Sequence, residues 1–268
     1  MNITHYKPKN EILRLYIDSY YFIAKSESYL PVHYMTFPNN FCIVSTIQNS
    51  SVKLVDGKVI IAPSTNKSIV TDVVVRYIKP LEVVYQKPVN EITIKFKPLG
   101  FNHFVNNPSD YFKEGLNRDI KPFEDFDEQM DTILNISDKN EQVESLEKYW
   151  LSKLKIVELD KIEAIVQDVE STLSIAEIAK KHNISRQYLN KIFTKNLGKT
   201  PSEYRKVFKF KKALEGFQSV NDLTELSYNC LFYDQSHFIK EFKSLTNMKP
   251  SSFFKNIDPS KEAIWLFL

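Results

Sequence analysis

Short apolar runs and turn residues alternate along the first part of the chain. Between residues 12 and 97, runs of β-branched and aromatic residues are separated by turn signals such as Pro38-Asn39-Asn40 and Asp56-Gly57. An Asp-Gly pair between two such runs indicates a β-hairpin, because these residues adopt the backbone of a tight turn. Short strands spaced this closely, without amphipathic helices between them, predict an antiparallel β-barrel or sandwich of the cupin-like kind.

Helical spacing replaces the strand pattern after Pro98. The segments 101–106, 124–136 and 140–156 are predicted to form helices that flank the barrel. The last of these segments has an apolar stripe that comprises Val143, Leu146, Trp150, Leu151 and Leu154. This stripe either packs on the barrel or pairs with another subunit.

From residue 160 onward the pattern is helical, with hardly a strand signal. The length of 268 residues fits two domains, since one domain typically holds about 100–150 residues. The pattern therefore predicts an α+β protein. Residues 1–157 would form a β-barrel sensor or dimerisation domain with a helical extension, and residues 158–268 an all-α domain.

The helical domain contains a sequence repeat. Residues 175–206 align with residues 223–255 at an offset of 48 residues, which becomes 49 after one inserted residue. The aligned pairs include Ile178 with Leu226, Ile184 with Phe232, Leu189 with Phe238, Phe193 with Phe242 and Pro201 with Pro250. One supersecondary unit therefore occurs twice.

Each repeat has the pattern of two short helices joined by a tight turn, a helix-turn-helix. In the first repeat, Ser174 and Ser185 can each cap a helix, and Asn183 lies where the chain must turn. In the second repeat, Asp234 occupies the position of Ser185. The predicted segments are a first helix-turn-helix at 174–198, a linker helix at 202–217 and a second helix-turn-helix at 222–247.

The second helix of each unit leaves a polar face outward when its apolar side is buried. Amides, hydroxyls and cations in its first turns can hydrogen-bond base edges in the major groove or phosphate oxygens. The predicted DNA-contacting residues are Arg186, Gln187, Tyr188, Asn190 and Lys191 in the first unit and Gln235, Ser236, His237 and Lys240 in the second. Asp234 and His237 could also suggest a catalytic or metal pair, but the alignment with Ser185 favours capping for Asp234.

Positive charge is concentrated in the same part of the chain. Residues 180–212 hold eleven Lys or Arg against Glu203 alone, a local charge of +10 in a chain of net charge +3. A cluster of one sign attracts polyanions. The charge alone fits either a nucleic-acid partner or a basic surface.

Composition and motifs argue against several other classes of protein. No apolar run reaches the roughly 18–20 residues of a membrane-spanning helix, and the polar start lacks a signal peptide, so we expect a cytoplasmic protein. Cys42 and Cys230 lie far apart, and His5, His33 and His103 are isolated, so no metal or cofactor is expected. Nucleophile motifs, phosphate loops and Gly-rich fingerprints are missing from the sequence, which disfavours an enzyme.

The two repeats and their linker resemble the AraC/XylS family of bacterial transcription regulators, over about residues 165–255. The resemblance rests on "IAEIAKKHNISRQYLNKIFTKNLGKTPSEYRK" and "FYDQSHFIKEFKSLTNMKPSSF". It implies a DNA-binding domain of seven helices, in which two helix-turn-helix units enter successive major grooves about 34–36 Å apart. The base-contacting positions that the resemblance implies are Gln187, Asn190, Lys191, Gln235, Ser236 and Lys240.

The chain departs from the family pattern at three positions. Leu231 stands where the family usually has the turn glycine of the second unit, Ser227 where it usually has alanine, and Lys209 where it usually has arginine. A leucine with a left-handed backbone costs about 1–2 kcal/mol, so either this turn is built differently or the strain is tolerated. A lysine also lacks the bidentate hydrogen bonding of arginine.

The N-terminal part is similar, through "FPNNFCIVSTI" and "IKFKPLGFNHFVNNPSDYF", to the β-barrel effector or dimerisation domains that precede this DNA-binding domain. Its aromatic residues either line an apolar pocket for a small effector or form an ordinary core. The candidate pocket residues are Tyr20, Phe22, His33, Tyr34 and Phe37. The apolar segment "AIWLFL" at residues 263–268 is expected to dock on one of the two domains.

The sequence thus predicts a DNA-binding transcriptional regulator that contacts promoter DNA with helices starting at Ser185 and Asp234. RNA polymerase, a small-molecule effector and a second copy of the chain are the further candidate partners. One alternative is an interaction protein that keeps the fold without specific DNA binding. The other alternative is a barrel enzyme fused to a DNA-binding domain.

Overall fold

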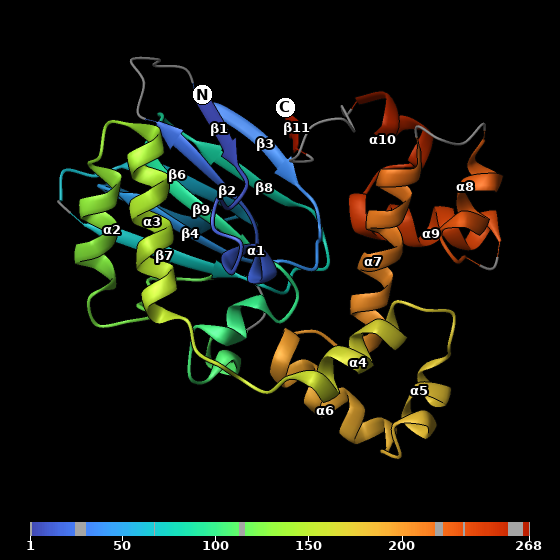
Figure 1. Ribbon diagram of the computed structural model, residues 1–268. Helices are drawn as coiled ribbons and strands as arrows, with labels where there is room; N and C mark the ends of the chain where they lie inside the picture. Colours follow the sequence, from blue (N-terminus) through green and yellow to red (C-terminus); the bar gives the residue numbers. More distant parts are fainter. Residues whose placement is uncertain are drawn as a thin grey trace. The chain divides into compact units, whose positions relative to one another are not determined.

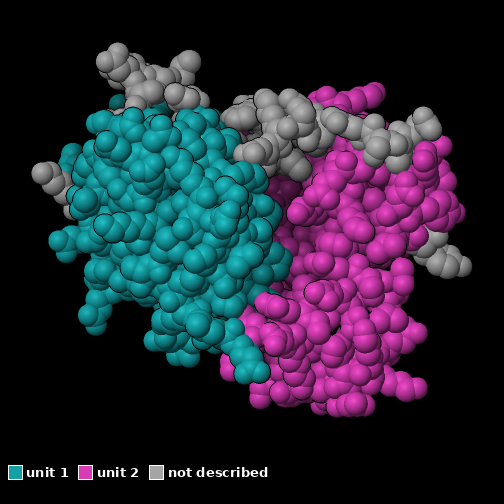
Figure 2. Space-filling view, in the orientation of Figure 1, with its two compact units in different colours: residues 1–33, 41–75, 82–158 teal, residues 34–40, 76–81, 159–268 magenta. Residues whose placement is uncertain are grey.

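The structure is a computed structural model, and it divides into two compact units (Figure 2). It describes residues 2–24, 31–66, 68–112, 116–217, 222–232, 234–256 and 265–267. Unit 1 comprises residues 1–33, 41–75 and 82–158, and unit 2 comprises residues 34–40, 76–81 and 159–268. The division into domains 1–157 and 158–268 stays a prediction.

Two β-sheets dominate the N-terminal part of the chain (Figure 1). The first sheet has the antiparallel order β1 (Asn2–Tyr6), β2 (Ile17–Ala24), β9 (Asn90–Phe96), β4 (Cys42–Gln48), β7 (Ile69–Val74) and β10 (Leu116–Asn117). The second has the order β11 (Trp265–Phe267), β3 (Val32–Thr36), β8 (Leu81–Tyr85), β6 (Lys58–Pro63) and β5 (Ser50–Val55). The predicted barrel or sandwich is confirmed as two sheets that do not close into one barrel.

The sequence predicted one hairpin in the second sheet correctly but not the direction of one strand pair. The hairpin at Asp56-Gly57 joins β5 to β6, with left-handed φ angles of 50° and 77° at its two central residues. Strands β6 and β8 pair in parallel, so a purely antiparallel arrangement was wrong at this position. The reason is connectivity: β7 lies between β6 and β8 in the sequence but belongs to the other sheet, and the chain returns to β6 in the same direction.

Helices α2 (Phe126–Leu134) and α3 (Lys139–Lys153) cover one face of the first sheet (Figure 1). The apolar stripe of α3 points into the core of unit 1, where Val143, Leu146 and Trp150 are fully buried. The stripe therefore packs on the sheet rather than on another subunit. The predicted helix at 101–106 is instead a short 3-10 helix, Gly100–His103, in which the Phe104 N–H donates to the Phe101 carbonyl oxygen three residues back, as in a 3-10 helix and not an α-helix.

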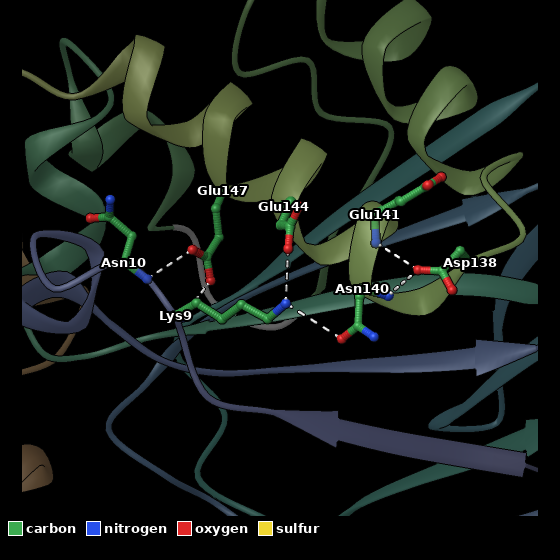
Figure 3. Close-up of polar contacts among 7 residues, drawn as sticks. All are labelled: Lys9, Asn10, Asp138, Asn140, Glu141, Glu144 and Glu147. Atoms are coloured by element: carbon green, nitrogen blue, oxygen red, sulfur yellow. Dashed lines mark hydrogen bonds and ion pairs between the residues drawn. The ribbon is translucent and has the colours of Figure 1, made fainter.

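The N-terminal segment is tied to α3 through the buried carboxylate of Glu147 (Figure 3). This carboxylate accepts hydrogen bonds from the backbone N–H groups of Lys9 at 2.7 Å and Asn10 at 2.9 Å. The Lys9 ammonium also lies 3.1 Å from a Glu144 carboxylate oxygen. Two backbone donors offset the cost of burying the Glu147 charge, and the segment leading to α1 (Leu13–Tyr16) is thereby fixed.

Seven helices form the described C-terminal part of unit 2. They are α4 (Asp160–Val169), α5 (Ile175–Lys181), α6 (Arg186–Leu197), α7 (Pro201–Gly216), α8 (Leu223–Asn229), α9 (Gln235–Thr246) and α10 (Pro250–Asn256). Helix α7 is the predicted linker helix, and it begins with Pro201, as expected for a residue without a backbone N–H at a helix start. The all-α prediction for this region is confirmed, apart from the short strand β11, which pairs with β3 at residues 34–36.

Two short segments from the N-terminal half complete the core of unit 2. Phe37 is 4% exposed and belongs to the hydrophobic cluster of α7, α9 and α10, where its ring lies 4.8 Å from the ring of Phe253. Asn40 donates to the carbonyl oxygen of Tyr204 at 3.0 Å, and the Arg76 guanidinium lies 2.6 Å from a Glu203 carboxylate oxygen. Unit 2 is therefore assembled from three separate stretches of the chain.

In the described part of the chain, none of the helices combines the length and the apolar character needed to cross a membrane.

Replacing Phe37 by alanine should destabilise unit 2, because it removes a buried ring from the helical core. We expect a loss of about 3–5 kcal/mol in the free energy of unfolding, with faster amide hydrogen exchange in α7 and α10. Leu54→Ala shortens an exposed side chain and serves as the control. Unchanged exchange in α7 and α10 would show that Phe37 is not part of this core.

Candidate nucleic-acid interface

Helix caps define the first helix-turn-helix, formed by α5 and α6. The Ser174 hydroxyl accepts from the Glu177 N–H at 3.2 Å, while the Glu177 carboxylate accepts from the Ser174 N–H at 2.7 Å, which is a complete capping box. The Ser185 hydroxyl accepts from the Tyr188 N–H at 3.1 Å and caps α6. Asn183 has the left-handed φ of 53° that the turn between the helices requires. Each of these roles matches the sequence-based prediction.

Helix α6 buries one face and exposes the other. Leu189 and Phe193 are fully buried, and the Phe193 ring lies 5.4 Å from the ring of Tyr204 on α7. All five predicted DNA-contacting residues of this unit are exposed: Arg186, Gln187, Tyr188, Asn190 and Lys191. The first turns of α6 therefore offer amide, phenol and cationic groups to a partner.

The second helix-turn-helix, formed by α8 and α9, has the same construction. Asp222 accepts from the N–H groups of Thr224 and Glu225, and this holds the pKa of its carboxyl below the usual value. Asp234 accepts from the His237 N–H at 2.7 Å and caps α9. Helices α6 and α9 are both 12 residues long, so the repeat in the sequence is a repeat in structure.

The outward face of α9 is less open than that of α6. Ser236, His237 and Lys240 are exposed, whereas Gln235 is only half-exposed and its side-chain oxygen lies 3.4 Å from the Thr224 hydroxyl. The His237 imidazole lies 3.1 Å from the Glu241 carboxylate, one turn along the same helix. Two of the four predicted contact residues in this unit therefore already have a polar partner within the domain.

The turn of the second unit retains the left-handed backbone in spite of its leucine. Leu231 has a φ of 64°, and its N–H and that of Phe232 bond to the carbonyls of Tyr228 and Ser227, both at 3.0 Å. Asn183 has the corresponding conformation in the first unit. The strain of a leucine is therefore tolerated here, and the turn is not built differently.

The cations of residues 180–212 divide into two groups. Three are turned into unit 2: Arg205 bonds the carbonyls of Asp168 and Val169, Lys209 bonds the carbonyl of Leu231, and Lys199 is 2% exposed. The exposed members on α5 and α6 are Lys180, Lys181, Arg186, Lys191 and Lys195. Only part of the local charge of +10 is thus available to a partner.

Asp168 joins α4 to the end of α5. Its carboxylate oxygens lie 2.7 Å from the Lys181 ammonium and 2.7 Å from the His182 imidazole. The hydrogen bond from Lys181 is the main reason that the pKa of Asp168 is lowered, and the bond from His182 adds to it. This contact was not predictable from the sequence, because the partners are separated by 13 and 14 residues and share no periodic pattern.

The predicted ligand-pocket residues lie in different surroundings. Tyr20 and Phe22 belong to the hydrophobic core beneath α2 and α3, whereas Phe37 belongs to the core of unit 2. His33 contacts Glu82, which also binds Lys58 at 2.7 Å, and Tyr34 is buried. A pocket shared by all five residues has no support from these contacts and stays a prediction.

Unit 1 contains a buried polar cluster that the sequence did not indicate. The Glu91 carboxylate accepts from the hydroxyls of Ser45 at 2.6 Å, Thr93 at 2.7 Å and Tyr85 at 2.5 Å. Burial raises the pKa of Asp72 to about 7, although the Arg118 charge opposes the shift. Alternation in β4, β7 and β9 places Ser45, Asp72, Glu91 and Thr93 on one face of the first sheet, and Tyr85 reaches Glu91 from β8 of the second sheet.

Comparison with known proteins assigns the helical region. Residues 169–256 match the family model described as a helix-turn-helix domain. The Msm operon regulatory protein of Streptococcus mutans is 35% identical over 88 residues, which are 32% of this chain and 32% of that protein. The uncharacterized HTH-type transcriptional regulator YdeC of Bacillus subtilis is 33% identical over 84 residues, 31% of this chain and 29% of its own length. The chain thus matches about a third of the length of these relatives.

Solved structures are similar at lower identity. A structure of ToxT from Vibrio cholerae aligns over 95% of this chain and 97% of its own, with 14% identity and a TM-score of 0.41. A transcriptional regulator with an AraC-type DNA-binding domain from Chromobacterium violaceum aligns over 34% of this chain and 83% of its own, with 24% identity and a TM-score of 0.30. At these TM-scores the fold assignment rests on the helices and strands described above.

Replacing Leu231 by glycine should stabilise the second helix-turn-helix. The relief of left-handed strain, about 1–2 kcal/mol, exceeds the entropic cost of about 0.5–1 kcal/mol that glycine brings. Thermal unfolding should therefore shift upward by a few degrees, and Leu231→Asn, which copies Asn183, should do the same. A lower melting temperature for both variants would mean that the packing of the leucine outweighs its strain.

Replacing Asp72 by asparagine should stabilise unit 1 above neutral pH. The pKa of Asp72 is near 7 in the folded chain and about 3.9 when unfolded, so the folded state binds the extra proton between these values. Stability contributed by the wild-type carboxyl is therefore lost as the pH rises from about 4 to 7. At pH 8, urea unfolding of the variant should require on the order of 1–3 kcal/mol more free energy, and a variant that is less stable at pH 8 would contradict the assignment.

Proposed function

We propose that this chain is a sequence-specific DNA-binding transcriptional regulator of the AraC type, because residues 169–256 match a helix-turn-helix family model and the relatives are regulatory proteins. One observation supports this proposal above the others. Two helix-turn-helix units of equal dimensions are built on one linker helix, and each exposes the polar first turns of a 12-residue helix. Such a pair of helices suits two successive major grooves on one face of B-DNA.

The groups on α6 match the chemistry of base edges and phosphates. Gln187 and Asn190 can bond adenine in a bidentate manner, and Lys191 can donate to guanine. Arg186 and Tyr188, together with the N–H groups of the first turn, suit phosphate oxygens. Because all five side chains are exposed, α6 is the stronger candidate for direct base contact.

Helix α9 would contribute with fewer groups. Ser236 and Lys240 are exposed and can reach base edges or phosphates, whereas Gln235 and His237 must first leave Thr224 and Glu241. Breaking such bonds costs free energy that DNA contacts must offset. We therefore expect the second half-site to tolerate more sequence variation than the first.

The remaining partners belong to the same proposal. A regulator of this kind acts on promoter DNA in the cytoplasm and would contact RNA polymerase there. The two-sheet N-terminal part could respond to a small molecule or join two copies of the chain. The relatives of the helical region are named as regulatory proteins, which favours a regulator over an enzyme.

The alternative is an interaction protein without specific DNA binding. Its main support was Leu231, which stands in the turn of the second helix-turn-helix where the family usually has glycine. That turn keeps its left-handed residue and both backbone hydrogen bonds. The geometry therefore favours DNA binding by both units over a damaged second unit.

The proposal is tested by selecting genomic DNA fragments with the purified protein, sequencing them, and measuring affinity for the recovered operator. Gln187→Ala and Lys191→Ala should each weaken specific binding by about 1–3 kcal/mol, with an unchanged circular dichroism spectrum. The logarithm of the affinity of the wild-type protein should fall linearly with the logarithm of salt concentration, by about 0.9 per phosphate neutralised.

Lys53→Ala removes the same charge from an exposed position of β5 in unit 1 and is the matched control. It should leave the operator affinity unchanged. If the wild type and both α6 variants bind the selected operator with equal affinity, α6 does not contact the DNA.

A further inference from the structure

Lys209 of the linker helix reaches the turn of the second helix-turn-helix. Its ammonium donates to the carbonyl oxygen of Leu231 at 2.5 Å and lies 4.9 Å from the centre of the Phe232 ring. Both partners belong to the turn that joins α8 to α9. A single cation on α7 thus holds this turn by a charge-assisted hydrogen bond and a cation–π contact.

The position of this cation suits the electrostatics of a helix end. Helix α8 ends at Asn229, so the carbonyl of Leu231 lies just beyond its C-terminus, where unsatisfied carbonyls gather and positive charge is favourable. Leu231 is also the residue with the strained left-handed backbone. The cation therefore binds the carbonyl of a residue whose backbone is strained, next to the C-terminus of α8.

Arg205 makes a comparable contact at the end of α4, the helix that precedes the first unit. It lies four residues before Lys209, so both side chains project from the same face of α7. Its guanidinium donates to the carbonyl of Val169 at 2.8 Å and reaches that of Asp168 at 3.5 Å, at the C-terminus of α4. The Asp168 carboxylate in turn binds Lys181 and His182 at the end of α5. Two cations from one face of α7 thus bind backbone carbonyls at the C-terminal ends of two other helices, α4 and α8.

We propose that Lys209 is a positioning residue: with Arg205, it fixes the second helix-turn-helix relative to the linker helix, and thereby sets the presentation of α9 to DNA. This inference rests on the proposed function for its DNA-binding consequence, but its structural part stands apart from it. Lys209 acts on DNA through the turn and not by direct contact.

The surroundings of Lys209 agree with this role. The side chain is half-buried, and desolvation lowers the pKa of its ammonium, while the nearby carboxylate of Glu241 on α9 opposes the shift. A phosphate-binding lysine would instead be exposed, as Lys191 and Lys195 are on α6. The interaction with Glu241 adds a link from α7 to the helix that would contact DNA.

The structural part is tested by amide hydrogen exchange on the free, full-length chain. Lys209→Met keeps the length of the side chain without its charge, and should speed exchange at the Leu231 and Phe232 amides about tenfold. The corresponding amides of the first unit, Asn183 and Ile184, should not change. Lys209→Arg, which can still donate to the carbonyl, should restore the wild-type rates, and Lys211→Met removes a charge from an exposed position of the same helix as the control.

The functional part is tested on the selected operator and on a version whose second half-site is scrambled. Lys209→Met should reduce the preference for the intact operator about tenfold and leave the dependence of affinity on salt unchanged. Unchanged exchange at Leu231 and Phe232 would overturn the proposal. A salt slope lowered by about one phosphate would overturn it as well, by making Lys209 a direct DNA contact. If the wild type itself prefers no operator, the proposed function fails while the exchange result still decides the role of Lys209.

Discussion

The packing of both helix-turn-helix units onto α7 is the constraint on which the rest of unit 2 depends. Near its start, Tyr204 meets Phe193 of α6, with ring centres 5.4 Å apart, and later Phe210 meets Phe242 of α9, with ring centres 5.1 Å apart. A helix of 16 residues is about 24 Å long and behaves as a stiff spacer. The separation and orientation of the two exposed helices follow from where on α7 each unit is buried.

The start of α7 is secured by more than its own sequence. Thr200 and Glu203 form a capping box, and the second oxygen of the Glu203 carboxylate binds the Arg76 guanidinium. Arg76 precedes β8 in the sequence, and Phe37, which packs in the hydrophobic cluster of α7, α9 and α10, follows β3. The chain therefore supplies the linker helix with partners from its N-terminal half, so a change in the backbone at either segment would act directly on α7.

Local signals in the sequence predicted most of the helical region. The repeat, the caps at Ser174, Ser185 and Asp234, and the buried aromatic positions of α6 and α9 are all confirmed, because each depends on neighbours within one or two turns. The hairpin at Asp56-Gly57 is confirmed for the same reason. The helices predicted at 124–136, 140–156 and 202–217 begin and end within three residues of the observed α2, α3 and α7.

Contacts between distant residues were not predictable in the same way. Lys209 and Leu231 are 22 residues apart, Arg76 and Glu203 are 127 apart, and neither pair belongs to a periodic pattern. The sequence suggested Lys209 as a weakened counterpart of a family arginine, whereas the structure engages it with a strained turn. The parallel pairing of β6 with β8 and the strand β11 likewise depend on topology, which hydrophobic spacing does not encode.

We expect α6 and α9 to contact DNA together, at a separation set by α7. This arrangement is tested most directly by measuring affinity for the selected operator after inserting five base pairs between its two half-sites, which rotates one half-site to the opposite face of the duplex. The affinity should fall to that of a single half-site, and inserting a full turn of about ten base pairs should not restore it, because α7 is a stiff spacer. Equal affinity for the original operator and the operator with five added base pairs would show that α7 does not set the separation of the two DNA-contacting helices.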